Sequence, residues 1–183
     1  SDTAQISGVV TRGDTGQPLE GAMVRLVRWD GGLGRQFPPV RTDAEGRFRV
    51  GQLPPGDYAA TFSADGFVSL EFGQRHPQMP AQRIELAAGQ QYTSANITLP
   101  RTVAIEGHLV DEFGDPVPGL LVQVMRVQFV AGKHRLMPVG GSRGATSNDL
   151  GHFRLFNLPP GEYYLVALSG PFAGAEAAAG FSL

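Results

Sequence analysis

The sequence predicts an all-β chain that folds as two β-sandwiches in tandem, and three observations support this prediction. Apolar and polar residues alternate over short runs, as in strands with one buried and one solvated face. The 25 glycines and 14 prolines are spread along the chain, where they supply the dihedral angles of tight turns. Four sequence blocks occur twice in the same order, and their spacing of about 100 residues indicates two domains rather than solenoid repeats.

Alternation identifies the strands. Val24 and Leu26 share one face of a run rich in β-forming residues, and Arg25 lies on the other face. Residues 47–50 and 92–99 alternate in the same way. This pattern is typical of antiparallel strands with one face in the core and one in water.

The repeated blocks are the strongest evidence for two domains. In order, they are Ile6-Ser7-Gly8-Val9-Val10 and Ile105-Glu106-Gly107-His108-Leu109-Val110; residues 16–24 and 114–122, which share Gly-x-Pro-x-x-Gly; residues 42–48 and 147–153; and Leu53-Pro54-Pro55-Gly56-Asp57-Tyr58 and Leu158-Pro159-Pro160-Gly161-Glu162-Tyr163. The offset is 98 residues at the second block and 105 at the fourth, so the second copy carries a longer connection between these blocks.

Two of the blocks predict specific local contacts. In the third block, Asp43 is expected to cap backbone N–H groups of a hairpin turn, with Gly46 in the left-handed conformation and Phe48 in the core. In the fourth, Tyr58 is expected to bury its ring while its hydroxyl bonds a neighbouring loop, like a tyrosine corner.

These blocks resemble the carboxypeptidase regulatory-like domain family over roughly residues 4–100 and 101–183. The resemblance implies Greek-key sandwiches of the prealbumin-like or immunoglobulin-like kind, similar in shape to transthyretin, Cna-B repeats and starch-binding-like folds. It also implies an accessory module of a secreted, periplasmic or cell-surface bacterial protein. The first five residues carry no signal-peptide features, so either the protein is cytoplasmic or its signal peptide is absent from this sequence.

The second copy departs from this pattern at its end. After Tyr58 the first copy continues for about 40 residues, whereas only 20 follow Tyr163, and residues 174–180 are rich in alanine. The sequence therefore indicates a piece of a longer protein or a second domain that lacks its last strands.

Charge and composition exclude several classes of function. The formal net charge is −2, and Arg41, Arg47 and Arg49 do not form the basic stripe with exposed aromatic residues that nucleic-acid binding needs. No apolar run reaches the roughly 18–20 residues of a membrane helix, so we expect no direct membrane insertion. Cysteine is absent, which excludes disulfides and thiol chemistry.

The residues also predict no catalytic, cofactor or metal site. No Gly-x-Ser-x-Gly elbow accompanies the histidines, which are interpreted as surface residues. His108 with Asp111 and Glu112 is a compact candidate for a metal site, but turn capping is the better interpretation of the acidic pair Asp43 and Glu45.

Two activities of similarly shaped domains are excluded by the sequence. A Lys–Asn isopeptide bond is not expected, because the first copy has no lysine and Lys133 falls in the insertion rather than on a strand. The end Gly180-Phe181-Ser182-Leu183 differs from the Tyr-Arg-Gly-Ser motif of hydroxyisourate hydrolases.

Two glycine-rich connections are the candidate contact regions. The first holds Trp29, Arg35 and Phe37, and the second holds His134 and Arg135. An aromatic ring beside an arginine can stack on a sugar or anchor a protein partner. We therefore expect a non-catalytic structural or protein-interaction module, whose partners are other domains of the same protein or a separate protein. The alternative is a polysaccharide-binding accessory domain that uses Trp29.

Overall fold

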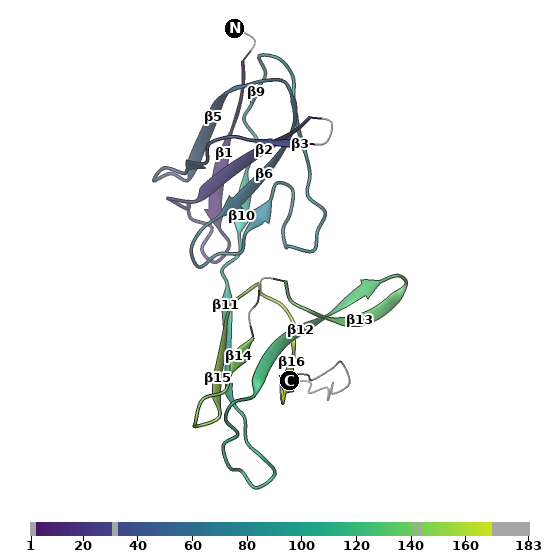
Figure 1. The fold of residues 1–183 in the computed structure, drawn as a ribbon. Coiled ribbons are helices and arrows are strands. Elements are labelled where there is room, and N and C mark those ends of the chain that lie inside the picture. Colours follow the sequence, from purple (N-terminus) through teal and green to yellow (C-terminus); the bar gives the residue numbers. More distant parts are fainter. Residues whose placement is uncertain (1–2, 31–32, 141, 143, 170–183) are drawn as a thin grey trace. The chain divides into compact units, whose positions relative to one another are not determined.

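The computed structural model describes residues 3–30, 33–140, 142 and 144–169, and these residues form strands and turns without a helix (Figure 1). The chain divides into two compact units, Ser1–Arg101 and Thr102–Leu183. The fold class is all-β with several sheets, as the alternation predicts.

The first unit contains two sheets. One has the order β10-β1-β5, with β9 also paired to β1; the other has the order β3-β2-β6-β7, with β4 paired to β2 and β8 to β6. The strands are β1 (Ala4–Arg12), β2 (Met23–Asp30), β3 (Leu33–Gln36), β4 (Val40–Arg41), β5 (Arg47–Leu53), β6 (Gly56–Ser63), β7 (Leu70–Glu71), β8 (Ile84–Leu86), β9 (Gln91–Tyr92) and β10 (Ile97–Leu99).

The inward faces of these sheets form the core of the first unit. Along β1 buried and half-buried residues alternate, and β6 repeats this pattern with Tyr58, Ala60 and Phe62 fully buried. The rings of Phe62 and Phe48 meet edge to face, with centroids 5.6 Å apart. Period-two alternation thus places one face of each strand in the core.

The last strands of the first unit differ from the expectation. Residues 92–99 form two short strands rather than one, and both β9 and β10 pair with β1 in parallel, not antiparallel. Antiparallel pairing joins β1 to β5 on its other edge. Alternation reports which face is buried, but it does not report strand direction, which depends on the path of the intervening chain.

The second unit also contains two groups of paired strands. One is β11-β15; the other has the order β13-β12-β14, with β16 paired to β12. Its strands are β11 (Val103–His108), β12 (Leu121–Val130), β13 (Lys133–Pro138), β14 (Ala145–Thr146), β15 (His152–Leu158) and β16 (Tyr164–Leu168). Its core includes Val122, Val124, Phe153, Leu155 and Leu158. The alanine-rich residues 174–180 lie outside the described part of the chain.

The expectation that Arg35, His134 and Arg135 lie in connections between strands is wrong, whereas Phe37 does lie in one, between β3 and β4. Trp29 lies on β2 and Arg35 on β3, while Lys133, His134 and Arg135 lie on β13. In the second unit the turn consists of Ala131 and Gly132, both with positive φ (50° and 77°), as in the two-residue turns that suit β-hairpins. The longer connection of the second copy is therefore largely a longer hairpin.

The predicted local contacts are confirmed in both units. The Asp43 carboxylate accepts hydrogen bonds from the N–H groups of Glu45 and Arg47, and Asn148 accepts the corresponding bonds from Leu150 and His152. Gly46 adopts a positive φ of 69°. In each turn the side chain of the first residue, Asp43 or Asn148, therefore accepts hydrogen bonds from the backbone of the same turn. These bonds fix the register of the strand that follows.

The tyrosine of the fourth block anchors the crossing between sheets. The Tyr58 hydroxyl donates to the carbonyl oxygen of Pro54 at 2.6 Å, and the Tyr163 hydroxyl donates to that of Pro159. In each unit the chain leaves one sheet before the proline pair and enters the other sheet after it. Burial raises the pKa of the Tyr163 hydroxyl, and the nearby Arg126 partly offsets this rise.

We expect Tyr58→Phe to lower the free energy of unfolding by about 1 kcal/mol, because it removes a hydrogen bond and keeps the buried ring. Urea denaturation of the variant and the parent chain measures the difference. Tyr92→Phe is the matched control, because the Tyr92 ring packs edge-on against Phe72 and its hydroxyl has no hydrogen-bond partner among the described residues. Equal losses in the two variants would contradict a role for the Tyr58 hydroxyl.

Candidate functional site

The contact residues predicted in the first unit lie around the β2–β3 hairpin. Trp29 is 47% exposed, and the guanidinium of Arg83 lies 5.1 Å from the centre of its ring. The guanidinium of Arg35 lies over Phe37, which also packs against the ring of Tyr58. Phe37 therefore packs against the periphery of the core, while the Trp29 ring remains accessible to solvent beside Arg83.

The contact residues predicted in the second unit lie on a longer hairpin. β16 pairs with β12 only from Leu121 to Met125, so residues 126–137 of β12 and β13 form a two-stranded ribbon, which Figure 1 shows projecting from its sheet. We call residues 126–137 the ribbon. His134 and Arg135 both lie on it.

One face of the ribbon is mainly apolar. Residues that alternate along a strand share a face, and the pairing places Val127 opposite Leu136 and Phe129 opposite His134. Val127 is 40% exposed and Phe129 is 69% exposed, and the rings of Phe129 and His134 are 5.2 Å apart. Among the described residues Phe129 is therefore largely uncovered, whereas Val127 is partly covered.

The other face of the ribbon carries basic groups. Arg126, Lys133 and Arg135 alternate with the apolar residues of the first face. The Arg126 guanidinium lies 4.8 Å from the ring centre of Tyr163, so this side chain is tied to the sheet. Lys133 and Arg135 are exposed near the tip. The ribbon thus combines an apolar face with positive charge at its end.

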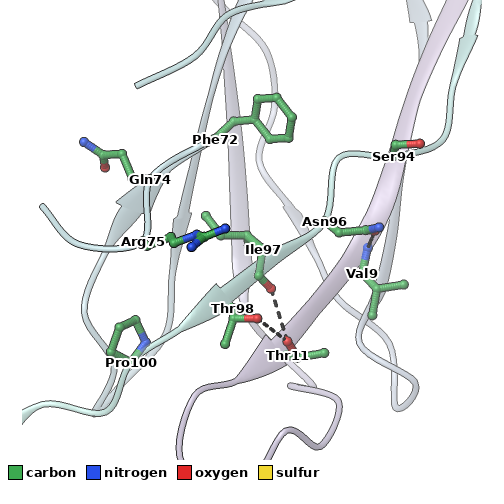
Figure 2. A pocket seen from close by; sticks show the side chains of 11 residues that line it. Val9, Thr11, Phe72, Gln74, Arg75, Ser94, Asn96, Ile97, Thr98 and Pro100 are labelled. Atoms are coloured by element: carbon green, nitrogen blue, oxygen red, sulfur yellow. Dashed lines mark hydrogen bonds between the residues drawn. The ribbon is translucent and has the colours of Figure 1, made fainter. Parts of the chain in front are cut away.

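A hollow of 780 Å³ lies on the first unit between β10 and the turn at residues 72–75 (Figure 2). Its polar groups are largely engaged within the fold: the Thr11 and Thr98 hydroxyls are 2.8 Å apart, and Asn96 accepts the N–H of Val9. Arg75 is the one ionisable residue in its lining. The lining therefore offers no carboxylate or imidazole for general acid–base catalysis.

Histidines and carboxylates do not converge on a site in the described residues. The rings of His108 and His152 lie side by side across two strands, with centroids 5.0 Å apart, a pairing that was not predicted. No group of three or more potential ligands surrounds a metal position in the described part of the chain. Within the same residues no helix is of a length and hydropathy that would cross a membrane.

A charged cluster lies at one end of the first unit. Arg12 donates two hydrogen bonds to the Asp14 carboxylate, and Arg101 lies 3.5 Å from the same carboxylate. The hydrogen bond from Arg12 holds the pKa of Asp14 below its usual value. Arg12 and Arg101 also both lie over the ring of Phe67. The cluster fastens the ends of β1 and β10 to each other and has no free acid for catalysis.

The comparisons with known proteins agree with this architecture. The family model of the carboxypeptidase regulatory-like domain matches residues 5–100, and no curated protein matches the chain. A streptococcal ancillary pilin is similar in structure, with a TM-score of 0.52 and 20% identity; the match covers 100% of this chain and 58% of the pilin. GBS52, a minor pilin of Streptococcus agalactiae, matches with a TM-score of 0.44 and 15% identity over 92% of this chain and 84% of its own.

Proposed function

The chain belongs to the carboxypeptidase regulatory-like domain family, and on this premise we propose that it is a non-catalytic structural and protein-interaction module. In this proposal residues 4–100 and 101–183 are two tandem copies of the domain. The module is part of a larger secreted, periplasmic or cell-surface bacterial protein, and its partner is another domain of that protein or a separate protein.

Matching strand registers support the tandem relationship. β1 pairs with β5 through Ile6–Val50 and Gly8–Phe48, and β11 pairs with β15 through Ile105–Leu155 and Gly107–Phe153. Both pairs contain a register shift at the same place, and Gln52 and Asn157 adopt nearly the same positive φ there (57° and 58°). Agreement in such irregular detail supports a common domain, because bulges are specific features of a fold.

The lining of the hollow and the fold of the neighbours support a structural role. The hollow lacks the acid and base that a hydrolytic mechanism requires. The streptococcal ancillary pilin has a similar fold, which is compatible with a module that builds or joins a surface structure.

The apolar face of the ribbon is the observation that carries the proposal. A two-stranded hairpin alone is at most marginally stable in water, and exposed apolar side chains on it lose the benefit of burial. A partner that covers Val127 and Phe129 would restore this benefit. Lys133 and Arg135 lie near the tip on the other face of the ribbon, so we expect a partner that reaches past the tip to carry carboxylates there, because opposite charges attract each other at an interface.

Photo-crosslinking in the native cell tests the proposal. We expect a photoreactive phenylalanine analogue placed at position 129 of the full-length protein to form a discrete crosslink to one protein. The combined change Lys133→Glu and Arg135→Glu should reduce the yield severalfold, because it reverses the charge that attracts an acidic rim. Immunoblotting of the crosslinked species measures the yield.

The matched control places the same analogue at position 156, where Phe156 is 66% exposed on β15 and lies outside the ribbon. A crosslink at position 129 with none at position 156 supports the ribbon as the contact surface. Equal yields at both positions, or none at position 129, would contradict it. Retention on a polysaccharide gel that disappears in Trp29→Ala would instead favour the sugar-binding alternative.

A further inference from the structure

Two histidines face each other on the outer face of the β11–β15 pair. The pairing places His108 directly opposite His152, and the centres of their rings are 5.0 Å apart. Phe153, the next residue along β15, is buried on the inner face, so the alternation of the strand turns His152 outward. His108 is exposed and His152 is half-buried. Both imidazoles can therefore be reached from solvent.

The backbone holds this pair where two strands come closest. The N–H of Leu109 donates to the carbonyl oxygen of Gly151, and hydrogen-bonded pairs alternate with non-hydrogen-bonded pairs along an antiparallel ladder. His108 and His152 are therefore a non-hydrogen-bonded pair, in which Cα atoms are about 4.5 Å apart instead of about 5.5 Å. The backbone of His152 is also fixed by the turn, because its N–H donates to the Asn148 side chain and its carbonyl oxygen accepts the N–H of Asn148.

The distance between the two rings suits a shared metal ion. An ion about 2.1 Å from one nitrogen of each ring lies about 3.2 Å from each ring centre. The ring centres then stand about 4.5 Å apart at a right-angled N–metal–N angle and about 5.2 Å apart at a tetrahedral one. The observed separation of 5.0 Å falls between these values. Rotation of the side chains is therefore enough to bring one nitrogen of each ring to the same ion, and the strands need not move.

The surroundings leave these nitrogens to an outside ligand. Within the described residues neither ring makes a hydrogen bond. The next pair on the same face is Glu106 with Arg154, whose carboxylate oxygen and Nε are 4.0 Å apart. Because their charges are opposite, this pair adds no net charge beside the histidines. The sequence contains no cysteine that would compete for a metal.

The structure gives His108 a different partner from the one that the sequence suggested. The sequence grouped His108 with Asp111 and Glu112. In the structure the Asp111 carboxylate accepts the N–H groups of Phe113 and Asp115, so it caps its own turn. The second imidazole comes instead from the neighbouring strand. This pairing depends on strand register, which a local sequence pattern does not report.

The fold of the domain does not require these histidines. Their counterparts in the first unit are Val9 and Arg47, which pair in the same register of β1 and β5. A valine and an arginine are therefore compatible with the same pair of strands. The two imidazoles are a property of the second unit alone.

We propose that His108 and His152 together bind one divalent transition-metal ion, with Cu²⁺ bound most tightly and Ni²⁺ and Zn²⁺ less tightly. Imidazole nitrogen suits these three ions, and their affinities follow this order of preference for Cu²⁺. Among the described residues no group of three potential ligands surrounds a metal position, so water fills the other coordination positions. The second metal–nitrogen bond forms within one molecule and raises the affinity above that of a single histidine.

Isothermal titration calorimetry of the full chain with Ni²⁺ tests the proposal. We expect one ion to bind per chain. His108→Ala and His152→Ala should each weaken binding at least about tenfold, because the remaining histidine holds the ion by one bond only. Ca²⁺ and Mg²⁺ should give no binding heat, since these ions prefer oxygen ligands. The amide resonances of Phe153 and Leu155 should keep their positions in both variants, which checks that the strands remain paired.

The other two histidines of the chain supply the matched controls. The His76 ring lies beside the Gln78 side chain, and the His134 ring lies beside Phe129. His76→Ala and His134→Ala should therefore leave the Ni²⁺ affinity unchanged. In NMR spectra of the imidazole nitrogens, Zn²⁺ should shift the resonances of His108 and His152 and leave those of the other two histidines in place.

Three outcomes would overturn the proposal. The first is an affinity that stays the same in His108→Ala or in His152→Ala. The second is an equal loss in all four histidine variants, which would indicate unspecific binding to surface histidines. The third is one ion for every two chains, which would assign the ion to a bridge between two copies. None of these results bears on the proposed partner of the ribbon, because neither histidine of the pair lies on the ribbon.

Discussion

Gly8→Ala is expected to lower the free energy of unfolding of the first unit by about 3 kcal/mol. The added methyl group would overlap the carbonyl carbon and oxygen of Ala95. Both contacts are backbone atoms, so no side-chain rotation can relieve them. The segment would have to move away from β1, and Ala95, Ile97 and Leu99 would leave the core with it.

Urea denaturation followed by tryptophan fluorescence measures this loss. Trp29 is the only tryptophan in the chain and lies on β2, so its signal reports the first unit. Gly51→Ala is the matched control, because its Cβ would meet no atom within 4 Å and its φ is not in the left-handed region. It should cost less than about 0.5 kcal/mol. Equal effects at both glycines would contradict the steric argument.

Phe62→Ala is expected to cost the first unit about 4 kcal/mol, because it removes a fully buried ring and leaves a cavity. The loss includes the edge-to-face contact with Phe48. The same fluorescence-detected denaturation measures it. Phe156→Ala makes the same chemical change at a side chain that is 66% exposed, and circular dichroism should show a change below about 0.5 kcal/mol. A loss at Phe62 below 1 kcal/mol would contradict its place in the core.

Much of the fold could be predicted because its signals are local. Strand alternation, the capping residue Asp43 and the tyrosine Tyr58 each act within a few residues, and the structure contains the contacts predicted from them. The parallel direction of β9 and β10 could not be predicted in this way. It is set by the path of residues 64–90, whose pairing with distant strands leaves no short-range pattern.

The candidate site was predicted only in part, for a similar reason. Trp29, Arg35, His134 and Arg135 were identified by residue type, but they lie on hairpin strands rather than in loops. Ala131 gave no turn signal, since alanine rarely adopts the positive φ that it has here. The exposed face of Val127 and Phe129 follows from the short pairing of β16, which ends at Met125. The amino-acid types at positions 127 and 129 do not predict where the neighbouring strand β16 ends.

The parallel pairing of β1 with β10 also determines how the first unit carries a mechanical load. β1 begins near the start of the unit and β10 ends near its close, and both strands run in the same direction. A pull on the two ends of the unit therefore acts on opposite ends of neighbouring strands. The hydrogen bonds between them are loaded together in shear rather than opened one after another. A spacer built of such units would resist extension through its first and last strands.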